Sequence, residues 1–191
     1  YLSQAFSIEP DRADLHLALG ALEGVRGDLG ASVRHYERSC RLAADAWETH
    51  LLLGRALLAL ARAGSRPRLI ERASYHLVRS MRLDPTPDQH PRILRDMGIC
   101  CMQTGRSKEA QRFFIRLREN PDHAAIAKFY LGSVAYDAGK YNNAIQHFRA
   151  YLRERPDDTN VLARMAMAWF QMGDFSKARA SCNKALLVDP E

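Results

Sequence analysis

Apolar side chains recur at intervals of three and four residues along most of the chain, which is the period of an amphipathic helix. The pattern is clearest over residues 159–190, where Gly173-Asp174, a pair typical of a tight turn, interrupts it. We therefore predict helix, turn and helix in this segment, and pairs of helices along the whole chain. The expected helices are 13–26, 29–43, 47–63, 67–83, 91–104, 107–119, 123–138, 141–154, 158–172 and 175–188.

Small residues at regular intervals reveal an internal repeat. In the first helices they are spaced 34, 44, 34 and 34 apart, at Gly20, Gly54, Gly98, Gly132 and Ala166. In the second helices they are spaced 41, 37, 34 and 34 apart, at Ser32, Ala73, Ala110, Ala144 and Ala178. Two insertions, of seven residues before Ala73 and of three after it, explain every departure from 34. Because a helical turn takes about 3.6 residues, the longer insertion should extend both helices of its hairpin, with Pro67 opening the second.

The units resemble tetratricopeptide repeats, which are helical hairpins with Leu-Gly in the first helix and Gly at the turn. Their second helix carries Ala and an aromatic residue, and Pro lies near the end. The matches in the fourth unit are Leu131-Gly132, Gly139-Lys140-Tyr141, Ala144, Phe148 and Pro156. The resemblance divides the chain into a half repeat at 1–10 and repeats at 13–46, 47–90 with its insertion near 62–69, 91–124, 125–158 and 159–191. It implies an all-α, right-handed α-solenoid of stacked antiparallel helix hairpins.

The resemblance also implies that the first helices line a concave groove, in which the chain, as part of a larger protein, would hold a peptide or protein segment as an interaction scaffold. The expected groove residues are Glu48, Arg55, Arg92, Arg95, Asp96, Phe129, Tyr130, Ser133, Tyr136, Asn160, Arg164, Met167 and Phe170. Aromatic and arginine side chains dominate binding hot spots, and guanidinium pairs with carboxylates. We therefore expect a ligand with acidic and apolar residues. The alternative is that several of these rings pack between adjacent hairpins.

Other partners remain open at this stage. The chain could be the recognition arm of a larger enzyme or polysaccharide-secretion machine, and exposed solenoid ends could pair with another copy to form a homo-oligomer. A chaperone-binding subset of the family grips a carboxylate with Lys and Asn at set groove positions. This sequence instead has Leu17, Ala21, Leu52, Arg92 and Asp96 there, which disfavours chaperone C-termini.

Charge and hydropathy disfavour nucleic acid as a partner and membrane insertion. The net charge is +6 with 23 Arg, but the arginines are scattered and many lie late in second helices, where cations stabilise the helix end. This distribution disfavours nucleic acid. The longest apolar stretch, near residues 51–61, is broken by Gly54 and Arg55 and falls short of the roughly 20 residues that span a bilayer. We expect no membrane insertion by this segment.

The sequence offers no catalytic, cofactor or metal motif. Phosphate loops, HExxH, GxSxG and dinucleotide fingerprints are missing, and the seven histidines show no local ligand spacing, although His16 and His50 occupy equivalent positions of the repeat. We therefore predict no enzyme, no cofactor and no metal. The four cysteines, Cys40, Cys100, Cys101 and Cys182, form no CxxC pair. Free thiols favour a reducing, cytoplasmic compartment, with a periplasmic location as the alternative.

Three prolines fall within residues 84–91 and forbid a continuous helix there. A bend between two halves of the array would lie at this segment; an ordinary, longer inter-repeat turn is the alternative. The chain starts at Tyr1, and residues 1–10 match the end of a repeat's second helix. We therefore expect a piece of a longer protein.

Overall fold

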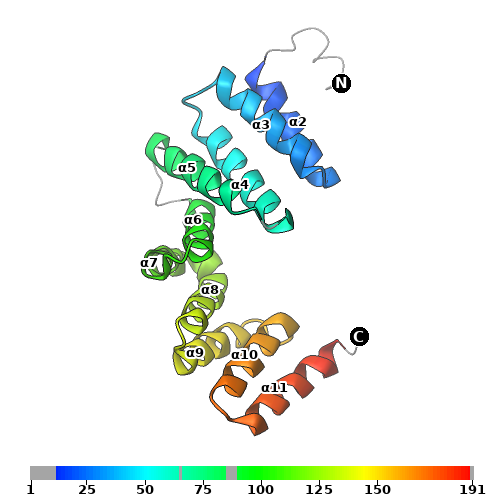
Figure 1. Ribbon diagram of the computed structural model, residues 1–191, viewed down its shortest axis with the longest axis vertical. Helices are drawn as coiled ribbons and strands as arrows, with labels where there is room; N and C mark the ends of the chain where they lie inside the picture. Colours follow the sequence, from blue (N-terminus) through cyan, green and yellow to red (C-terminus); the bar gives the residue numbers. More distant parts are fainter. Residues whose placement is uncertain (1–11, 65, 85–89, 190–191) are drawn as a thin grey trace. The chain divides into compact units, whose positions relative to one another are not determined.

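The computed structural model describes residues 12–64, 66–84 and 90–189, and these consist of helices and turns (Figure 1). The helices are α2 Ala13–Arg26, α3 Leu29–Leu42, α4 Trp47–Gly64, α5 Pro67–Leu83, α6 Pro91–Gln103, α7 Ser107–Arg118, α8 Ala124–Asp137, α9 Tyr141–Leu152, α10 Thr159–Gln171 and α11 Phe175–Val188, with a 3-10 turn, η2, at Pro121–His123. The predicted all-α class is confirmed for the described residues. Each predicted helix agrees with an observed one to within two residues at either end.

The chain divides into two compact units, residues 1–104 and 105–191. In the first unit α2 packs against α3 and α4 against α5, while α3 also contacts α4 and α5 contacts α6. In the second unit α8 packs against α9 and α10 against α11, while α7 contacts α8 and α9 contacts α10. Among the described residues, each unit therefore contains two hairpins and one further helix, α6 in the first and α7 in the second, which pack against their neighbours.

The second hairpin is longer than the others. Its helices α4 and α5 contain 18 and 17 residues, whereas the first hairpin has 14 in each and the last has 13 and 14. The predicted extension of both helices is confirmed, and α5 begins at Pro67 as expected. A proline suits this position because its missing N–H would have no partner within the helix.

A glycine in a left-handed conformation follows each of four helices, α2, α6, α8 and α10. The φ angles lie between 71° and 87° at Gly27, Gly105, Gly139 and Gly173. A side chain is strained in this region, so these turns require glycine.

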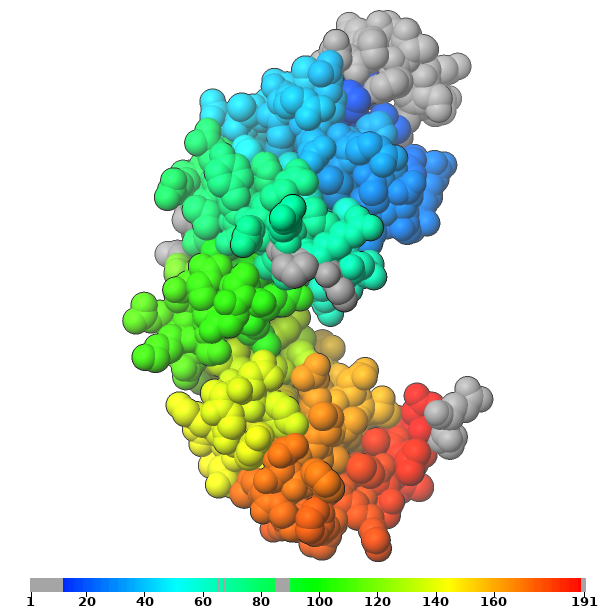
Figure 2. Space-filling view, viewed as in Figure 1, coloured from blue at the N-terminus to red at the C-terminus, as the bar shows by residue number. Residues whose placement is uncertain are grey.

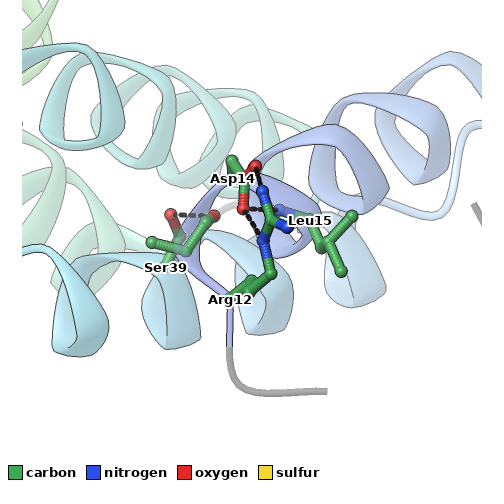
Figure 3. Close-up of polar contacts among 5 residues, drawn as sticks. Arg12, Asp14, Leu15 and Ser39 are labelled. Atoms are coloured by element: carbon green, nitrogen blue, oxygen red, sulfur yellow. Dashed lines mark hydrogen bonds and ion pairs between the residues drawn. The ribbon is translucent and has the colours of Figure 1, made fainter. Parts of the chain in front are cut away.

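A repeated hydrogen bond ties the second helix to the start of the first in two hairpins. The Ser39 hydroxyl donates to the Ala13 carbonyl at 2.8 Å, beside the beginning of α2 (Figure 3). In the next hairpin the Ser80 hydroxyl donates to the Trp47 carbonyl at 2.9 Å. Along the sequence, Ser39 and Ser80 are 41 residues apart, whereas Ala13 and Trp47 are 34 apart. The difference is the seven inserted residues. The structure thus preserves the register across the insertion.

At Gly132, the Phe148 ring of α9 packs directly on the backbone of α8. A β-carbon placed there would lie 2.6 Å from Cε1 of Phe148, and equivalent β-carbons would lie 2.7 Å from Tyr36 at Gly20 and 2.8 Å from Leu77 at Gly54. The small-residue series therefore lets one large side chain of the second helix pack directly on the backbone of the first.

Gly132→Ala should lower the free energy of unfolding by about 1–3 kcal/mol, because the packed Phe148 ring must move to admit a methyl group. Urea unfolding monitored by circular dichroism would measure the loss. The control is Gly24→Ala in α2, where the new β-carbon would lie 3.4 Å from the Ser32 hydroxyl oxygen, an ordinary contact. This control should leave stability unchanged or raise it by up to about 1 kcal/mol. Equal losses in both variants would contradict the packing argument.

Several expectations fall outside the described residues. The half repeat at 1–10, residue 65 of the insertion and residues 85–89 of the proline-rich segment are among them. The repeat boundaries and the bend at 84–91 stay predictions. Among the helices that the structure describes, none has the length and apolar character needed to span a membrane.

Candidate functional site

In the first unit, the expected groove residues centre on a buried carboxylate. Asp96 of α6 is 3% exposed. It accepts a hydrogen bond from Nε of Arg95 at 2.9 Å, and its second oxygen lies 3.3 Å from Nε of Arg55 in α4. The cluster therefore joins α4 to α6. The Asp96 carboxylate compensates the positive charges of Arg55 and Arg95, which were both expected to bind the ligand. Glu48 and Arg92 lie exposed.

In the second unit, three expected residues line one hollow of about 260 Å³, which we call the aromatic hollow. Its lining residues are Ile126, Phe129, Tyr151, Asp158, Asn160, Val161 and Arg164. The Arg164 guanidinium lies over the Phe129 ring, 5.5 Å from its centre. This geometry is a cation–π contact, and Arg164 remains exposed.

The floor of the aromatic hollow contains a fixed hydrogen bond. The Tyr151 hydroxyl donates to Asp158 at 2.7 Å, and the other Asp158 oxygen accepts from the Val161 amide at 3.1 Å, capping α10. Burial raises the pKa of Tyr151, and the Asp158 carboxylate raises it further. Both side chains are thus occupied within the fold, which leaves Arg164 and Asn160 as the exposed polar groups of the hollow.

A second, larger hollow of about 610 Å³ is lined by side chains of α8, α10 and α11, and we call it the apolar hollow. Residues of α10 and α11 are coloured orange to red in Figure 2. It is lined by Tyr136, Ala163, Ala166, Met167, Phe170, Gln171, Phe175, Ala178, Arg179 and Cys182. Met167 and Phe170 are 54% and 59% exposed. Phe170 meets the Phe175 ring edge to face, with 5.4 Å between centres. Met167, Phe170 and Phe175 therefore form an exposed apolar cluster at this hollow.

Two expected groove residues of the second unit, Tyr130 and Ser133, make contacts within the fold. Tyr130 stacks on Phe114 of α7, with ring centres 4.7 Å apart and planes at 9°. Ser133 is buried and donates to the Phe129 carbonyl at 3.2 Å. For Tyr130 the alternative of packing between helices is the one observed. The sequence could not separate these roles, because both are compatible with a first-helix position.

The structure also brings together a cluster that the sequence analysis missed. One ligand-type atom each from Cys40 of α3, His50 of α4 and His76 of α5 lies within 4.8 Å of the others. Burial raises the pKa of Cys40 to about 11. Burial, with a smaller contribution from His50, lowers the pKa of His76 to about 4. The thiol and the His76 ring are therefore both neutral near pH 7.

A related pair in the first hairpin shows how this cluster could have been found. The Nδ1 atoms of His16 and His35 are 3.0 Å apart, and those of His50 and His76 are 2.9 Å apart. His50 follows His16 by one repeat period, and His76 follows His35 by one period plus the seven inserted residues, which is the register of the two serines described above. The histidine pair is thus a repeated feature, visible only when the insertion is included in the spacing.

Comparison with known structures gives the fold of the whole chain. MamA of Desulfovibrio magneticus RS-1, from residue 41 to its end, is 16% identical with a TM-score of 0.79, and the match covers 94% of this chain and 96% of that one. YrrB, described as a TPR protein with an unusual peptide-binding site, is 15% identical with a TM-score of 0.71, covering 100% and 93%. Pseudomonas aeruginosa pilF is 16% identical with a TM-score of 0.75, covering 99% and 82%.

The sequence itself matches the same kind of repeat. Two family profiles, both described as tetratricopeptide repeat, match residues 98–159 and 135–191. These segments contain the small-residue positions and turn glycines that set α8 against α9 and α10 against α11. The two profiles together cover residues 98–191, so this part of the chain belongs to the tetratricopeptide-repeat family, and the solved structures show that the chain has a similar fold.

Proposed function

We propose that the chain is a protein–protein interaction scaffold that holds a peptide segment against α8 and α10 of the second unit. The observation that carries this proposal is the apolar hollow, where Met167 and Phe170 are more than half exposed beside Tyr136. Exposed apolar clusters of this kind are typical of sites where another protein binds. The proposal assigns the chain no catalytic step.

The preceding hairpin indicates what fits such a hollow. Tyr136, Tyr141 and Ala144 occupy the positions one repeat before Phe170, Phe175 and Ala178. Around those earlier positions, α10 packs with Val161, Leu162, Met165, Ala168 and Trp169. A surface equivalent to the apolar hollow thus receives an amphipathic helix within this same fold. We expect the ligand to present apolar residues at helical spacing.

Arg164 supplies the polar part of the proposed site. Its guanidinium is exposed and oriented by the Phe129 ring, and α10 also carries Met167 and Phe170 one and two turns further on. Arginine forms two parallel hydrogen bonds with a carboxylate. An acidic residue in the ligand, followed by apolar ones, would therefore meet Arg164 and then the apolar hollow.

The similarity to YrrB supports binding of a peptide in general terms, because that protein is described as having a peptide-binding site. The ligand chemistry proposed here rests on this chain's own side chains. Arg55 and Arg95 of the first unit, whose charges Asp96 compensates, are not part of the proposed peptide site.

The test is selection of peptides from a displayed random library on the intact protein, followed by titration of the best binder. We expect acidic and apolar residues among the selected sequences. Arg164→Glu and Phe170→Ala should each weaken binding at least tenfold, the first by repelling the acidic residue and the second by removing apolar contact area. Fluorescence anisotropy of the labelled peptide would measure both effects.

Matched controls are available in the same unit. Arg112→Glu alters an exposed arginine of α7, and Leu187→Ala alters a side chain of α11 that is 86% exposed and lines neither hollow. Both should bind the peptide as the unaltered protein does. If the controls weaken binding as much as Arg164→Glu and Phe170→Ala, the site lies elsewhere and the proposal fails.

A further inference from the structure

We propose that Cys40, His50 and His76 form a binding site for a borderline-soft transition-metal ion, with Zn²⁺ as the favoured ion. The three side chains come from α3, α4 and α5, so the ion would join the first hairpin to the second within one unit. The proposal is independent of the peptide site, which lies in the other unit.

The ligand atoms already lie close to zinc geometry. The two Nδ1 atoms of His50 and His76 are 2.9 Å apart, and Sγ of Cys40 lies 3.8 Å from Nδ1 of His50. A tetrahedral zinc ion, with bonds of about 2.0–2.1 Å to nitrogen and 2.3 Å to sulfur, separates two nitrogens by roughly 3.3 Å and nitrogen from sulfur by roughly 3.6 Å. The third separation, between the ligand atoms of Cys40 and His76, is at most 4.8 Å. Side-chain shifts of about 1 Å or less would therefore accommodate the ion.

His50 is held in the tautomer that a ligand requires. Its Nε2 lies 2.9 Å from the Ala44 carbonyl oxygen, which can only accept, so Nε2 carries the proton. In the neutral ring, Nδ1 then presents its lone pair toward His76 and Cys40. Metal-binding histidines usually donate their second N–H to a carbonyl or carboxylate in this way, which fixes the ring and strengthens the ligand.

The Cys40 thiol distinguishes this cluster from the histidine pair of the first hairpin. His16 and His35 form an equivalent pair in the first hairpin, with their rings 5.3 Å apart compared with 5.2 Å for His50 and His76. Cys40 precedes His50 by ten residues, whereas the residue ten before His16 is Phe6. A thiolate with two imidazoles favours zinc or copper(I) over magnesium or calcium, which prefer oxygen ligands.

Binding of the metal ion would release one proton to solvent. Without metal, Nδ1–H of His76 must donate to the unprotonated Nδ1 of His50, and Cys40 is a thiol. On binding, the His76 proton moves to Nε2 of the same ring and the Cys40 proton leaves to solvent. Cys40 and His76 are only half-buried, which gives the ion and the proton a route, and a fourth position is left for water or another ligand.

The test is titration of the intact protein with Co²⁺, a spectroscopic substitute for Zn²⁺, in the presence of a non-thiol reductant. We expect one ion per chain, a near-ultraviolet thiolate-to-cobalt charge-transfer band and visible bands of tetrahedral cobalt. Zn²⁺ should then displace the cobalt. Cys40→Ser should abolish the charge-transfer band, and Cys40→Ser and His76→Gln should each weaken binding at least tenfold.

Two variants serve as controls. Cys182→Ser removes an exposed thiol, and His35→Gln breaks the histidine pair that has no cysteine; both should bind as the unaltered protein does. Zn²⁺ should also raise the thermal midpoint of the unaltered protein and of Cys182→Ser, but not that of Cys40→Ser. Absence of the charge-transfer band, its survival in Cys40→Ser or its loss in Cys182→Ser would overturn the site.

Discussion

Phe148→Ala is expected to lower the free energy of unfolding of the second unit by about 3–5 kcal/mol. The Phe148 side chain is fully buried in α9. It lies against the backbone of Gly132 in α8 and belongs to the same apolar cluster as Val161 and Leu162 of α10. Removing the ring would therefore leave a cavity where three helices meet, and glycine at position 132 offers no side chain to fill it.

The two tryptophans allow this loss to be localised, since Trp47 lies in the first unit and Trp169 in the second. Urea unfolding followed through Trp169 fluorescence, in a Trp47→Phe background, should show the shifted transition. Repeat proteins lose stability chiefly in the altered repeat and its neighbours. The shift should accordingly be smaller when Trp47 is the probe, in a Trp169→Phe background.

The matched control is Phe175→Ala, which removes the same side chain from a position that is 63% exposed. It should cost about 1 kcal/mol or less, the contribution of its contact with Phe170. A loss at Phe175 as large as that at Phe148 would show that burial does not control the effect.

The helices and turns could be predicted closely because they depend on short-range features of the sequence, namely apolar spacing, turn glycines and the length of the insertion. Apolar spacing predicted the helix positions, and the glycine expected at the turn of the fourth unit, Gly139, does follow α8 in a left-handed conformation. The seven-residue insertion lengthened α4 and α5 as expected, because about two whole turns preserve the buried face. Each of these inferences depends on residues that are near one another in sequence.

The candidate site was only partly predictable, because its chemistry depends on contacts between helices. Position along a first helix does not distinguish Tyr130, which stacks on Phe114, from Phe170, which is exposed. Nor does it reveal that the charge of Arg95 is compensated by Asp96. The sequence indicated which face of each helix was available, while the partner of each side chain came from the structure.

The same limit applies to the cysteine–histidine cluster. Its residues are 10 and 26 positions apart along the chain, on three different helices, and no short motif joins them. Only the combination of the repeat period, the insertion and hairpin packing brings Cys40 beside His50 and His76. A search for local ligand spacing therefore had to miss it.

Arg55→Met combined with Arg95→Met should destabilise the first unit by about 3–5 kcal/mol, because it leaves the Asp96 carboxylate buried without a compensating charge. Asp96 has a side chain only 5% exposed, and its Oδ2 has no hydrogen bond among the described residues, only the ion pair with Arg55. Urea unfolding followed through Trp47, in a Trp169→Phe background, would measure the loss. The shift should be smaller with Trp169 as the probe.

The decisive comparison adds Asp96→Leu to the two methionine substitutions. Replacing a whole buried ion cluster by apolar residues of similar volume is often neutral, whereas removing one sign of charge is costly. The triple variant should therefore recover most of the stability that the double variant loses. If it does not, the arginines stabilise α4 and α6 through packing of their long side chains, and compensation of the Asp96 charge is not their principal role.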